Sequence, residues 1–196
     1  MKPDPIPVLF FRHGLTAGNL GGRYVGATDE PLHPKGREAL LRLRASFSER
    51  GITLPETVYA SPLLRCRESA ELLFPGVPVT VVPDFRECAF GAFAYRNFAE
   101  LDGDPAYQAY VDSGGTLAFP GGEEPAAFRK RCREAFLANA PVRRTAYVVH
   151  GGTVMAVLDA FSEPHRDYFD WQVKNACGFS GFWNPGEQTL TGLRPI

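Results

Sequence analysis

The chain has 196 residues, of which 44% are hydrophobic, and its formal net charge is -1. A chain of this length can bury a core and commonly folds as one domain, to which a small insertion can be added. Its lysines and arginines are scattered singly, without the basic stripe that follows a nucleic-acid backbone or an anionic membrane surface. We therefore expect a single domain over residues 1–196 that binds neither nucleic acid nor membranes. Its oligomeric state stays open, a homodimer included.

The four cysteines show no metal-binding pattern. Cys66, Cys88, Cys132 and Cys177 form no CxxC pair, and none lies at metal-ligand spacing from a histidine. We expect free thiols and no metal site. The N-terminal segment MKPDPIPVLFF holds four consecutive apolar residues after its prolines, too few for a signal-peptide core or a membrane span. A reducing cytoplasm is the expected location.

Three segments of the chain share one order: an apolar run, then polar residues, then a helical pattern. They are PVLFF (7–11) before RHG, TVYA (57–60) before SPLLRCRESAELLF, and AYVV (146–149) before HGGTVMAVLDAF. Short apolar runs bounded by turn signals fit strands that are buried on both faces, as in a parallel sheet. Strands that alternate with helices predict an α/β fold.

The remaining segments predict a three-layer α/β/α sandwich with a mostly parallel sheet. After the first run, apolar residues at helical spacing predict a crossover helix that Gly51 would cap at its C-terminus. VPVTVV (77–82) predicts another strand, and CGFSGFW, NPGEQ and TLTGL predict a closing hairpin around a Pro-Gly turn. From about residue 85 to 125 the pattern loosens into aromatics, glycines and one helical stretch. We interpret this region as a cap inserted over the carboxyl ends of the strands.

Charged residues follow the carboxyl ends of the predicted strands. Ligands of open α/β sheets bind outside these ends, so Arg12, His13, Arg65 and His150 should meet at one rim. Helices that begin there point N-terminal amides at the same place, which favours an anion. Arginine holds phosphate oxygens with planar, permanently charged donors, and a neutral imidazole can accept a phosphoryl group covalently. The rim therefore predicts a site for a tetrahedral dianion, with one histidine as nucleophile and the other as donor.

Blocks of sequence along nearly the whole chain match one family pattern. In chain order they are RHGLTAGN, GATDEPLHPKGREAL, ASPLLRCRESAELL, FRECAFGAF, FPGGEEPAAFRKR and VVHGGTVMAVL. They resemble, in the same order, the RHGxTxxN signature, the segment leading into the first helix, the SPLxRAxxTAxxL helix, the acid-bearing stretch, the GGES region and the second catalytic histidine of the histidine phosphatase superfamily. This superfamily is also called the phosphoglycerate mutase-like family.

The resemblance implies a role for each residue of the rim. His13 would be the nucleophile that becomes a phosphohistidine. Glu87 would protonate the leaving alkoxide and later take a proton from the attacking water, with no metal or other cofactor. The groups that would hold the phosphoryl oxygens or hydrogen-bond near them are Arg12, Asn19, Arg65, His150 and the backbone amide of Gly151.

Some positions depart from the family pattern or leave alternatives open. Leu15 stands where an acidic residue is usual, Ser69 where a threonine is usual, and Glu124 where a serine is usual. Asp84 and Glu100 stay as lesser candidates for the acid. None of these departures removes a core catalytic group.

Several other residues have a simpler expected role. His33 and His165 lie in polar stretches and are expected in solvent. The aromatic residues around the cap are expected mainly to pack, with some of them at the mouth of the site. These are Phe85, Phe90, Phe93, Tyr95, Phe98, Tyr107, Tyr110 and Phe119.

Three functions fit these residues. The first is a metal-independent phosphomonoesterase that acts on a small phosphorylated metabolite through a phosphohistidine. The second is a cofactor-dependent phosphoglycerate mutase, but the cap places Phe90 and Phe98 where the mutases carry tyrosine and lysine, and it has no paired arginines. The third is a phosphate-binding protein without turnover. The cap looks most like the small bacterial phosphatases, the α-ribazole phosphatase branch among them, so hydrolysis is the preferred prediction.

Overall fold

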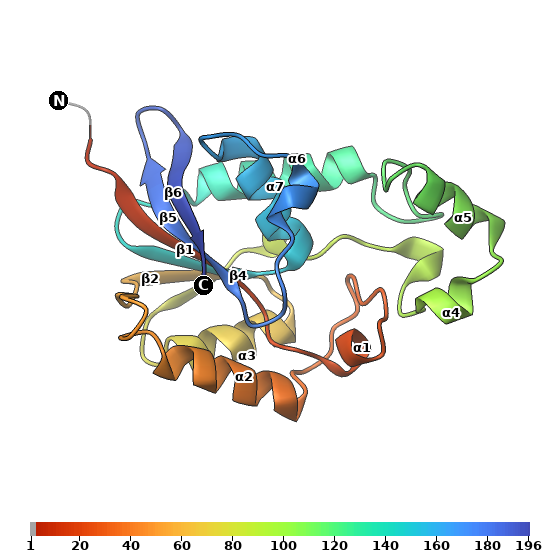
Figure 1. Ribbon diagram of the computed structural model, residues 1–196, viewed down its shortest axis with the longest axis horizontal. Helices are drawn as coiled ribbons and strands as arrows, with labels where there is room; N and C mark the ends of the chain where they lie inside the picture. Colours follow the sequence, from red (N-terminus) through yellow and green to blue (C-terminus); the bar gives the residue numbers. More distant parts are fainter. Residues whose placement is uncertain (1–2) are drawn as a thin grey trace.

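A six-stranded sheet forms the middle of the molecule in the computed structural model, which describes residues 3–196. The strand order is β3-β2-β4-β1-β5-β6, and the first four strands are parallel (Figure 1). The strands are β1 (Ile6–Arg12), β2 (Thr57–Ala60), β3 (Val79–Val81), β4 (Thr145–Val149), β5 (Gly178–Asn184) and β6 (Thr189–Pro195). The predicted α/β fold with a mostly parallel sheet is confirmed.

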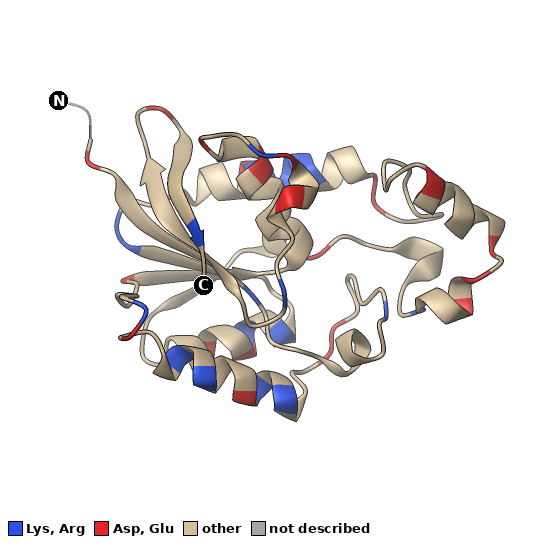
Figure 2. Cartoon of the chain, viewed as in Figure 1, with Lys and Arg blue, Asp and Glu red and all other residues tan. Residues whose placement is uncertain are grey.

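Two pairs of helices cover the two faces of the sheet (Figure 1). Helices α2 (Pro34–Ala45) and α3 (Leu64–Leu73) pack on one face, and α6 (Pro125–Ala138) and α7 (Gly151–Phe161) pack on the other. Basic side chains are frequent along α2 (Figure 2).

The burial of β1 explains why all its residues before Arg12 are apolar. Side chains of a strand alternate between its two faces. Val8 and Phe10 belong to the core beneath α6 and α7, while Leu9 and Phe11 belong to the core beneath α2 and α3. Strand β1 is therefore buried from both sides, and its carboxyl end carries a rigidly placed Arg12 to the edge of the sheet.

The antiparallel end of the sheet is the predicted hairpin. Strand β5 pairs antiparallel with β1 and with β6, and residues 185–188 turn between β5 and β6. At the opposite edge, β3 pairs with β2 alone, and its three residues are exposed. The strand predicted over 77–82 is present and spans Val79–Val81.

The region between β3 and α6 leaves the sheet and forms the side of the molecule where α4 and α5 lie (Figure 1). Its elements are η1 (Pro83–Phe85), η2 (Gly91–Phe93), α4 (Phe98–Leu101) and α5 (Pro105–Asp112). Its core is an aromatic cluster that consists mainly of Phe93, Tyr107 and Phe119, with Tyr24 and Phe90 against it. The expectation that the aromatics mainly pack is met by these residues, whereas Phe98 is 67% exposed. The single domain and the bounds of the cap stay a prediction.

The end of α2 differs from the prediction. The helix ends at Ala45, and Ser46 rather than Gly51 occupies the C-cap position. Residues 46–51 form turns, in which the Gly51 amide donates to the Ser48 carbonyl. Gly51 has a φ of 66°, so its left-handed backbone closes this turn instead of the helix.

Two short elements complete the chain. Helix α1 (Ala17–Leu20) follows β1, and η3 (Tyr168–Trp171) follows α7. Helix α1 begins with a capping box, in which the Thr16 and Asn19 side chains each accept a hydrogen bond from the other's backbone amide. This box holds the loop after β1 close to the carboxyl end of the strand.

Candidate functional site

The ends of β1 and β4 bring two histidines together. Arg12 and Val149 are paired across the parallel strands, and the next residue of each strand is a histidine. The rings of His13 and His150 lie with their centroids 5.2 Å apart and their planes at 67°. Both side chains are buried. The hydrophobic strands thus fix the distance between two imidazoles that are 137 positions apart in the sequence (150 minus 13).

The surroundings of His13 settle which ring nitrogen carries the proton. Nδ1 lies 2.8 Å from the carbonyl oxygen of Gly14, which can only accept, so Nδ1 must be the protonated nitrogen. Burial, with Arg65 and Arg12 nearby, lowers the pKa of His13 well below its ordinary value. The ring is therefore neutral and Nε2 carries the lone pair. This is the state that a nucleophilic imidazole requires.

Arg65 stands next to that lone pair. It is 1% exposed, and its Nε donates to Nε2 of His13 at 3.3 Å. Its other nitrogens donate to the carbonyl oxygens of Thr28 at 2.7 Å and Gly26 at 2.6 Å, which hold the guanidinium in place. A charge this deeply buried is costly without an anion beside it. No carboxylate of residues 3–196 forms an ion pair with Arg65, so the geometry favours an anion bound at Nε2 of His13.

Arg12 is the second cation of the site. Its Nη1 donates to the Val173 carbonyl at 2.9 Å, and its buried Nε has no hydrogen-bond partner within the described chain. Buried donors without a partner are rare in proteins and are frequent where a ligand binds. A phosphoryl oxygen would satisfy this nitrogen. Gly151, the first residue of α7, lies against the same guanidinium, because a Cβ there would be 3.5 Å from it.

His150 is oriented by a serine that sequence reasoning did not single out. Ser61 Oγ lies 2.7 Å from Nε2 of His150 and accepts the Leu63 amide at 3.3 Å. The serine hydroxyl can donate to Nε2, and Nδ1 of a neutral ring is then the donor. Burial, with Arg65 and His13 nearby, lowers the pKa of His150, so the neutral ring is the stable form. Ser61 lies in the ASPL segment, where its fixed place before α3 was the available signal.

Glu87 lies against the start of α7. Its Oε1 accepts the Cys88 amide at 3.0 Å. Burial of the carboxyl group raises its pKa, although Cys88 and the arginines oppose the shift. A Cβ at Gly152 would lie 2.8 Å from Oε1, so the second glycine of HGG makes room for the acid. A carboxyl group that holds its proton more firmly than usual can serve as a general acid.

The other acid candidates lie in solvent and are paired. Asp84 is bound to Arg86 at 3.0 Å, and Glu100 is bound to Arg23 at 2.8 Å. Arg23 lowers the pKa of Glu100, which opposes a role as proton donor. Neither carboxylate touches the two histidines in the described structure.

Asn19 reaches the site through a network of amides. Its Oδ1 accepts from Asn175 Nδ2 at 3.0 Å, and the same Nδ2 donates to the His13 carbonyl at 3.1 Å. Its role in binding phosphate stays a prediction. Asn175 was not foreseen, since nothing in its local sequence marks it as a neighbour of residues more than 150 positions away.

The departures from the family pattern have different consequences. Ser69 accepts the Gly14 amide at 3.0 Å and donates to the Arg65 carbonyl at 2.6 Å, so the hydroxyl that a threonine would supply is retained. Glu124 stands at the N-cap of α6 but makes no side-chain capping bond.

His33 and His165 lie outside the site, as expected, with His33 capping α2 and His165 near Asp167 in solvent.

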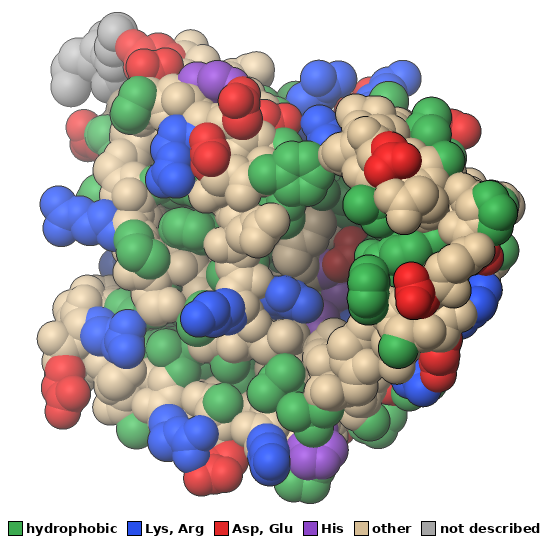
Figure 3. All heavy atoms as spheres, turned by 45° about the vertical axis from the view of Figure 1, so that its right-hand side comes forward, with side chains coloured by type: hydrophobic (Ala, Val, Ile, Leu, Met, Phe, Trp, Pro, Cys, Tyr) green, Lys and Arg blue, Asp and Glu red, His purple; other side chains and the backbone are tan. Residues whose placement is uncertain are grey.

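The site opens into a hollow between the cap and the rest of the molecule. Figure 3 shows histidine and acidic atoms in the depth of this hollow and hydrophobic and basic atoms along its edge.

Within residues 3–196, no group of three or more histidine, cysteine or acidic side chains could hold a metal ion, and the four cysteines are free. No helix in the same range is long and apolar enough to cross a bilayer.

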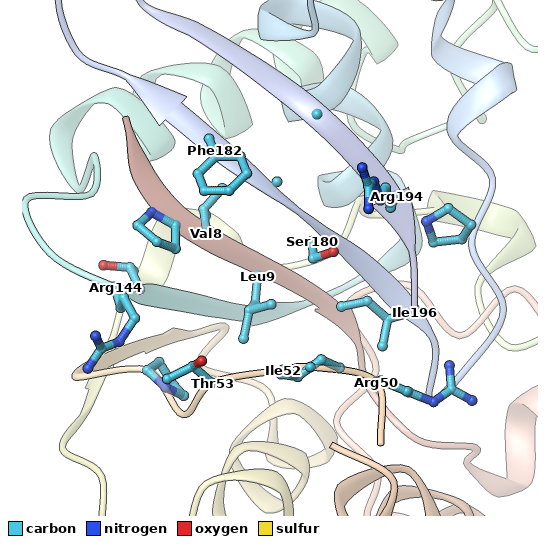
Figure 4. Close-up of a pocket in the computed structure, with 17 residues that line it drawn as sticks. Val8, Leu9, Arg50, Ile52, Thr53, Arg144, Ser180, Phe182, Arg194 and Ile196 are labelled. Atoms are coloured by element: carbon cyan, nitrogen blue, oxygen red, sulfur yellow. The ribbon is translucent and has the colours of Figure 1, made fainter. Parts of the chain in front are cut away.

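A second hollow lies at the other end of the sheet. It has a volume of about 720 Å³ and lies between the amino-terminal half of β1, the residues after α2 and strands β5 and β6 (Figure 4). Its charged lining residues are Arg50, Arg144 and Arg194. None of the described residues that line it is a histidine or an acid, so it has no group for the chemistry of the first hollow.

Comparisons with known proteins agree with this geometry. Residues 8–193 match the model of "Histidine phosphatase superfamily (branch 1)". The metal-independent phosphoserine phosphatase of Arabidopsis thaliana is 28% identical over 80% of this chain and 69% of its own. The adenosylcobalamin/alpha-ribazole phosphatase of Escherichia coli is 30% identical over 65% of this chain and 63% of its own. Proteins named as phosphoglycerate mutases are also among the matches.

A solved structure shows the same fold. A chain from Escherichia coli K-12, whose proposed identity is an alpha-ribazole-5'-P phosphatase, superimposes with a TM-score of 0.85 at 22% identity. The superposition covers 98% of this chain and 96% of that one. Two of the curated relatives are matched over less than half of their length, 41% and 44%. The family model spans nearly the whole sequence, and on that ground the chain belongs to branch 1 of the histidine phosphatase superfamily, whose members named above are phosphatases and mutases.

Proposed function

We propose that the protein is a metal-independent phosphomonoesterase that acts on a small phosphorylated metabolite through a phosphohistidine. The observation that carries the proposal is the state of His13, a buried neutral imidazole whose unprotonated Nε2 accepts from Nε of Arg65 at 3.3 Å. A nucleophile and a fixed cation at one point suit attack on phosphorus, where charge on the transferred group must be stabilised.

The residues divide the reaction into two transfers. In the first, Nε2 of His13 attacks phosphorus while Arg12, Arg65 and His150 hold the phosphoryl oxygens, and Glu87 gives its proton to the departing alkoxide. In the second, the Glu87 carboxylate takes a proton from water, which attacks the phosphohistidine and releases phosphate. The raised pKa of Glu87 supports the first step, because burial helps the carboxyl group to retain the proton that it donates.

The mutase alternative needs residues that hold the carboxylate of phosphoglycerate. The cap offers Phe90, which packs in the aromatic cluster, and Phe98, which is exposed. Neither can bind a carboxylate. A binding protein without turnover is the least supported of the three functions, because nucleophile, acid and cations lie together.

The test is turnover of an aryl phosphate by metal-free protein. We expect phosphate release, which would separate an enzyme from a silent binder. A panel of natural esters, with phosphoserine and α-ribazole phosphate included because relatives are named for them, would then compare leaving groups. Isomerisation of phosphoglycerate faster than its hydrolysis would replace the phosphatase by the mutase. A cytoplasmic location is part of the proposal, and the fractionation of cells with an antibody tests it.

A further inference from the structure

A stacked arginine lies on the helix that borders the acid side of the site. Arg129 of α6 places its guanidinium carbon 3.9 Å from the ring centroid of Tyr168, which belongs to η3. Both residues are partly buried. The next two cations of the helix have carboxylate partners, since Lys130 lies 3.9 Å from Glu134 and Arg131 lies 2.7 Å from Glu123. Arg129 forms no ion pair or hydrogen bond with the rest of the described chain.

This arginine is close to Glu87 through its neighbours. A Cβ at Gly152 would contact the ring of Phe128 at 3.0 Å and Oε1 of Glu87 at 2.8 Å, so the residue before Arg129 packs at the acid. Burial first, and then the Glu87 carboxyl group, raises the pKa of the Tyr168 phenol, while Arg129 lowers it. Tyr168 also packs against the buried cluster that contains Cys88 and Phe128, so it lies beside the residue that follows Glu87.

The stacking prepares the guanidinium for an anion. A guanidinium that lies flat on an aromatic ring loses little freedom when it binds, and the N–H groups at its edge stay available. Those donors match a carboxylate or a phosphate in two parallel hydrogen bonds. Glu87 protonates the leaving oxygen in the proposed reaction, so a cation beyond Glu87 lies on the side of the leaving group.

We propose that Arg129 binds a second anionic group, a carboxylate or a phosphate, on the leaving-group part of the phosphate ester. The inference rests on the proposed function and names its substrate class, a small phosphate ester with a second anionic group. The contact comes from α6 and not from the cap, so it is separate from the cap positions that distinguish mutases. A purely structural role, in which Arg129 supports Tyr168, predicts equal effects on all substrates.

Matched substrates separate these two roles. Phosphoserine and phosphoethanolamine differ by one carboxylate, and ethanediol bisphosphate and ethyl phosphate differ by one phosphate. For wild type we expect kcat/KM to favour the member with the additional carboxylate or phosphate in at least one pair by about tenfold or more, the effect of a charge-assisted hydrogen-bond pair. Arg129→Gln should bring that ratio close to unity, mainly through KM. Lys130→Gln, on the same helix but exposed, is the control and should keep the wild-type ratio.

The possible outcomes of this experiment distinguish the identity of the anion, the failure of the inference and the failure of the proposed function. A preference for the carboxylate pair or for the phosphate pair identifies the anion. A ratio that is unchanged in Arg129→Gln, or no preference in wild type for either pair, overturns the inference while phosphatase activity stands. Absence of turnover with every ester, an aryl phosphate included, overturns the proposed function instead. In that case calorimetric binding of phosphoserine and phosphoethanolamine to the same variants still decides the role of Arg129.

Discussion

Replacing Glu87 with glutamine tests the division of labour within the site. The amide keeps the shape of the side chain and an oxygen that can accept the Cys88 amide, which Oε1 now accepts at 3.0 Å. It removes the proton that burial helps the carboxyl group to retain. A positioned general acid contributes about a hundredfold or more when the leaving group is a basic alkoxide. It contributes little when a nitrophenolate leaves, because that anion departs without protonation.

The assay is the single-turnover burst measured by rapid quench, once with an alkyl phosphate and once with a nitrophenyl phosphate. The burst reports the phosphorylation of His13 alone, whereas steady-state rates also include the second step, in which Glu87 acts as base. We expect Glu87→Gln to slow the alkyl burst by about a hundredfold and the aryl burst far less. Arg65→Ala should slow both, because charge develops on the phosphoryl group whichever group leaves.

A matched control separates Glu87 from other carboxylates. Glu100→Gln removes an exposed carboxylate that is paired with Arg23 at 2.8 Å, and it should leave both bursts at the wild-type rate. Equal slowing of the two bursts in Glu87→Gln would refute the acid role. A selective loss of the alkyl burst in Glu100→Gln or in Asp84→Asn would transfer that role to the other residue.

Four further predictions concern the geometry, the protonation and the metal independence of the site. In Gly152→Ala the new Cβ would lie 2.8 Å from Glu87 Oε1 and would displace the carboxyl group. We therefore expect the rate of the alkyl phosphate burst to fall by about a hundredfold with little change in melting temperature. An unchanged burst rate would contradict this reasoning. Ser61→Ala should slow the phosphorylation of His13 by about tenfold, the effect of one hydrogen bond to a charged site. Nitrogen NMR spectra of this variant should show a mixture of the two neutral tautomers of His150. Ser61→Thr should retain the wild-type rate and the wild-type tautomer. Burial lowers the pKa of His13 and His150 in the folded protein, so the free energy of unfolding should fall as pH drops below about 6.5, where the unfolded chain binds protons that the folded one refuses. In urea titrations, His13→Gln should reduce the loss of unfolding free energy at low pH. The raised pKa of Glu87 acts in the opposite sense, but it is common to the wild type and the variant and cancels in the comparison. A chelator should leave turnover unchanged, and inhibition that magnesium or zinc reverses would contradict the account.

The sheet and the meeting of its strand ends could be predicted because their signals are local. Continuous apolar residues in β1 reflect two buried faces, and the polar residues after each strand mark its carboxyl end. Parallel strands place these ends at one edge. Arg12, His13 and His150 therefore converge for reasons that are legible in the sequence. The end of α2 was predicted wrongly, because Gly51 closes a turn that follows the helix and does not cap the helix itself.

Contacts between distant segments could not be predicted. Ser61 meets His150 across 89 positions and Asn175 meets Asn19 across 156, and neither pair has a local pattern that fixes its partner. The stacking of Arg129 on Tyr168 likewise depends on how η3 folds back against α6. Such contacts fix how side chains from distant segments are oriented. The family pattern predicts the residues that would react, but it does not predict the residues that orient them.

The central claim is that Nε2 of His13 accepts the phosphoryl group. The direct measurement mixes the protein with an aryl phosphate, quenches the burst in base and locates the phosphate by mass spectrometry of the peptides. The account predicts an acid-labile, base-stable phosphate on His13, formed at the burst rate and missing from His13→Ala, which should stay folded and lack turnover. Product formation without a phosphoenzyme, phosphate on His150, or undiminished turnover by His13→Ala would contradict it.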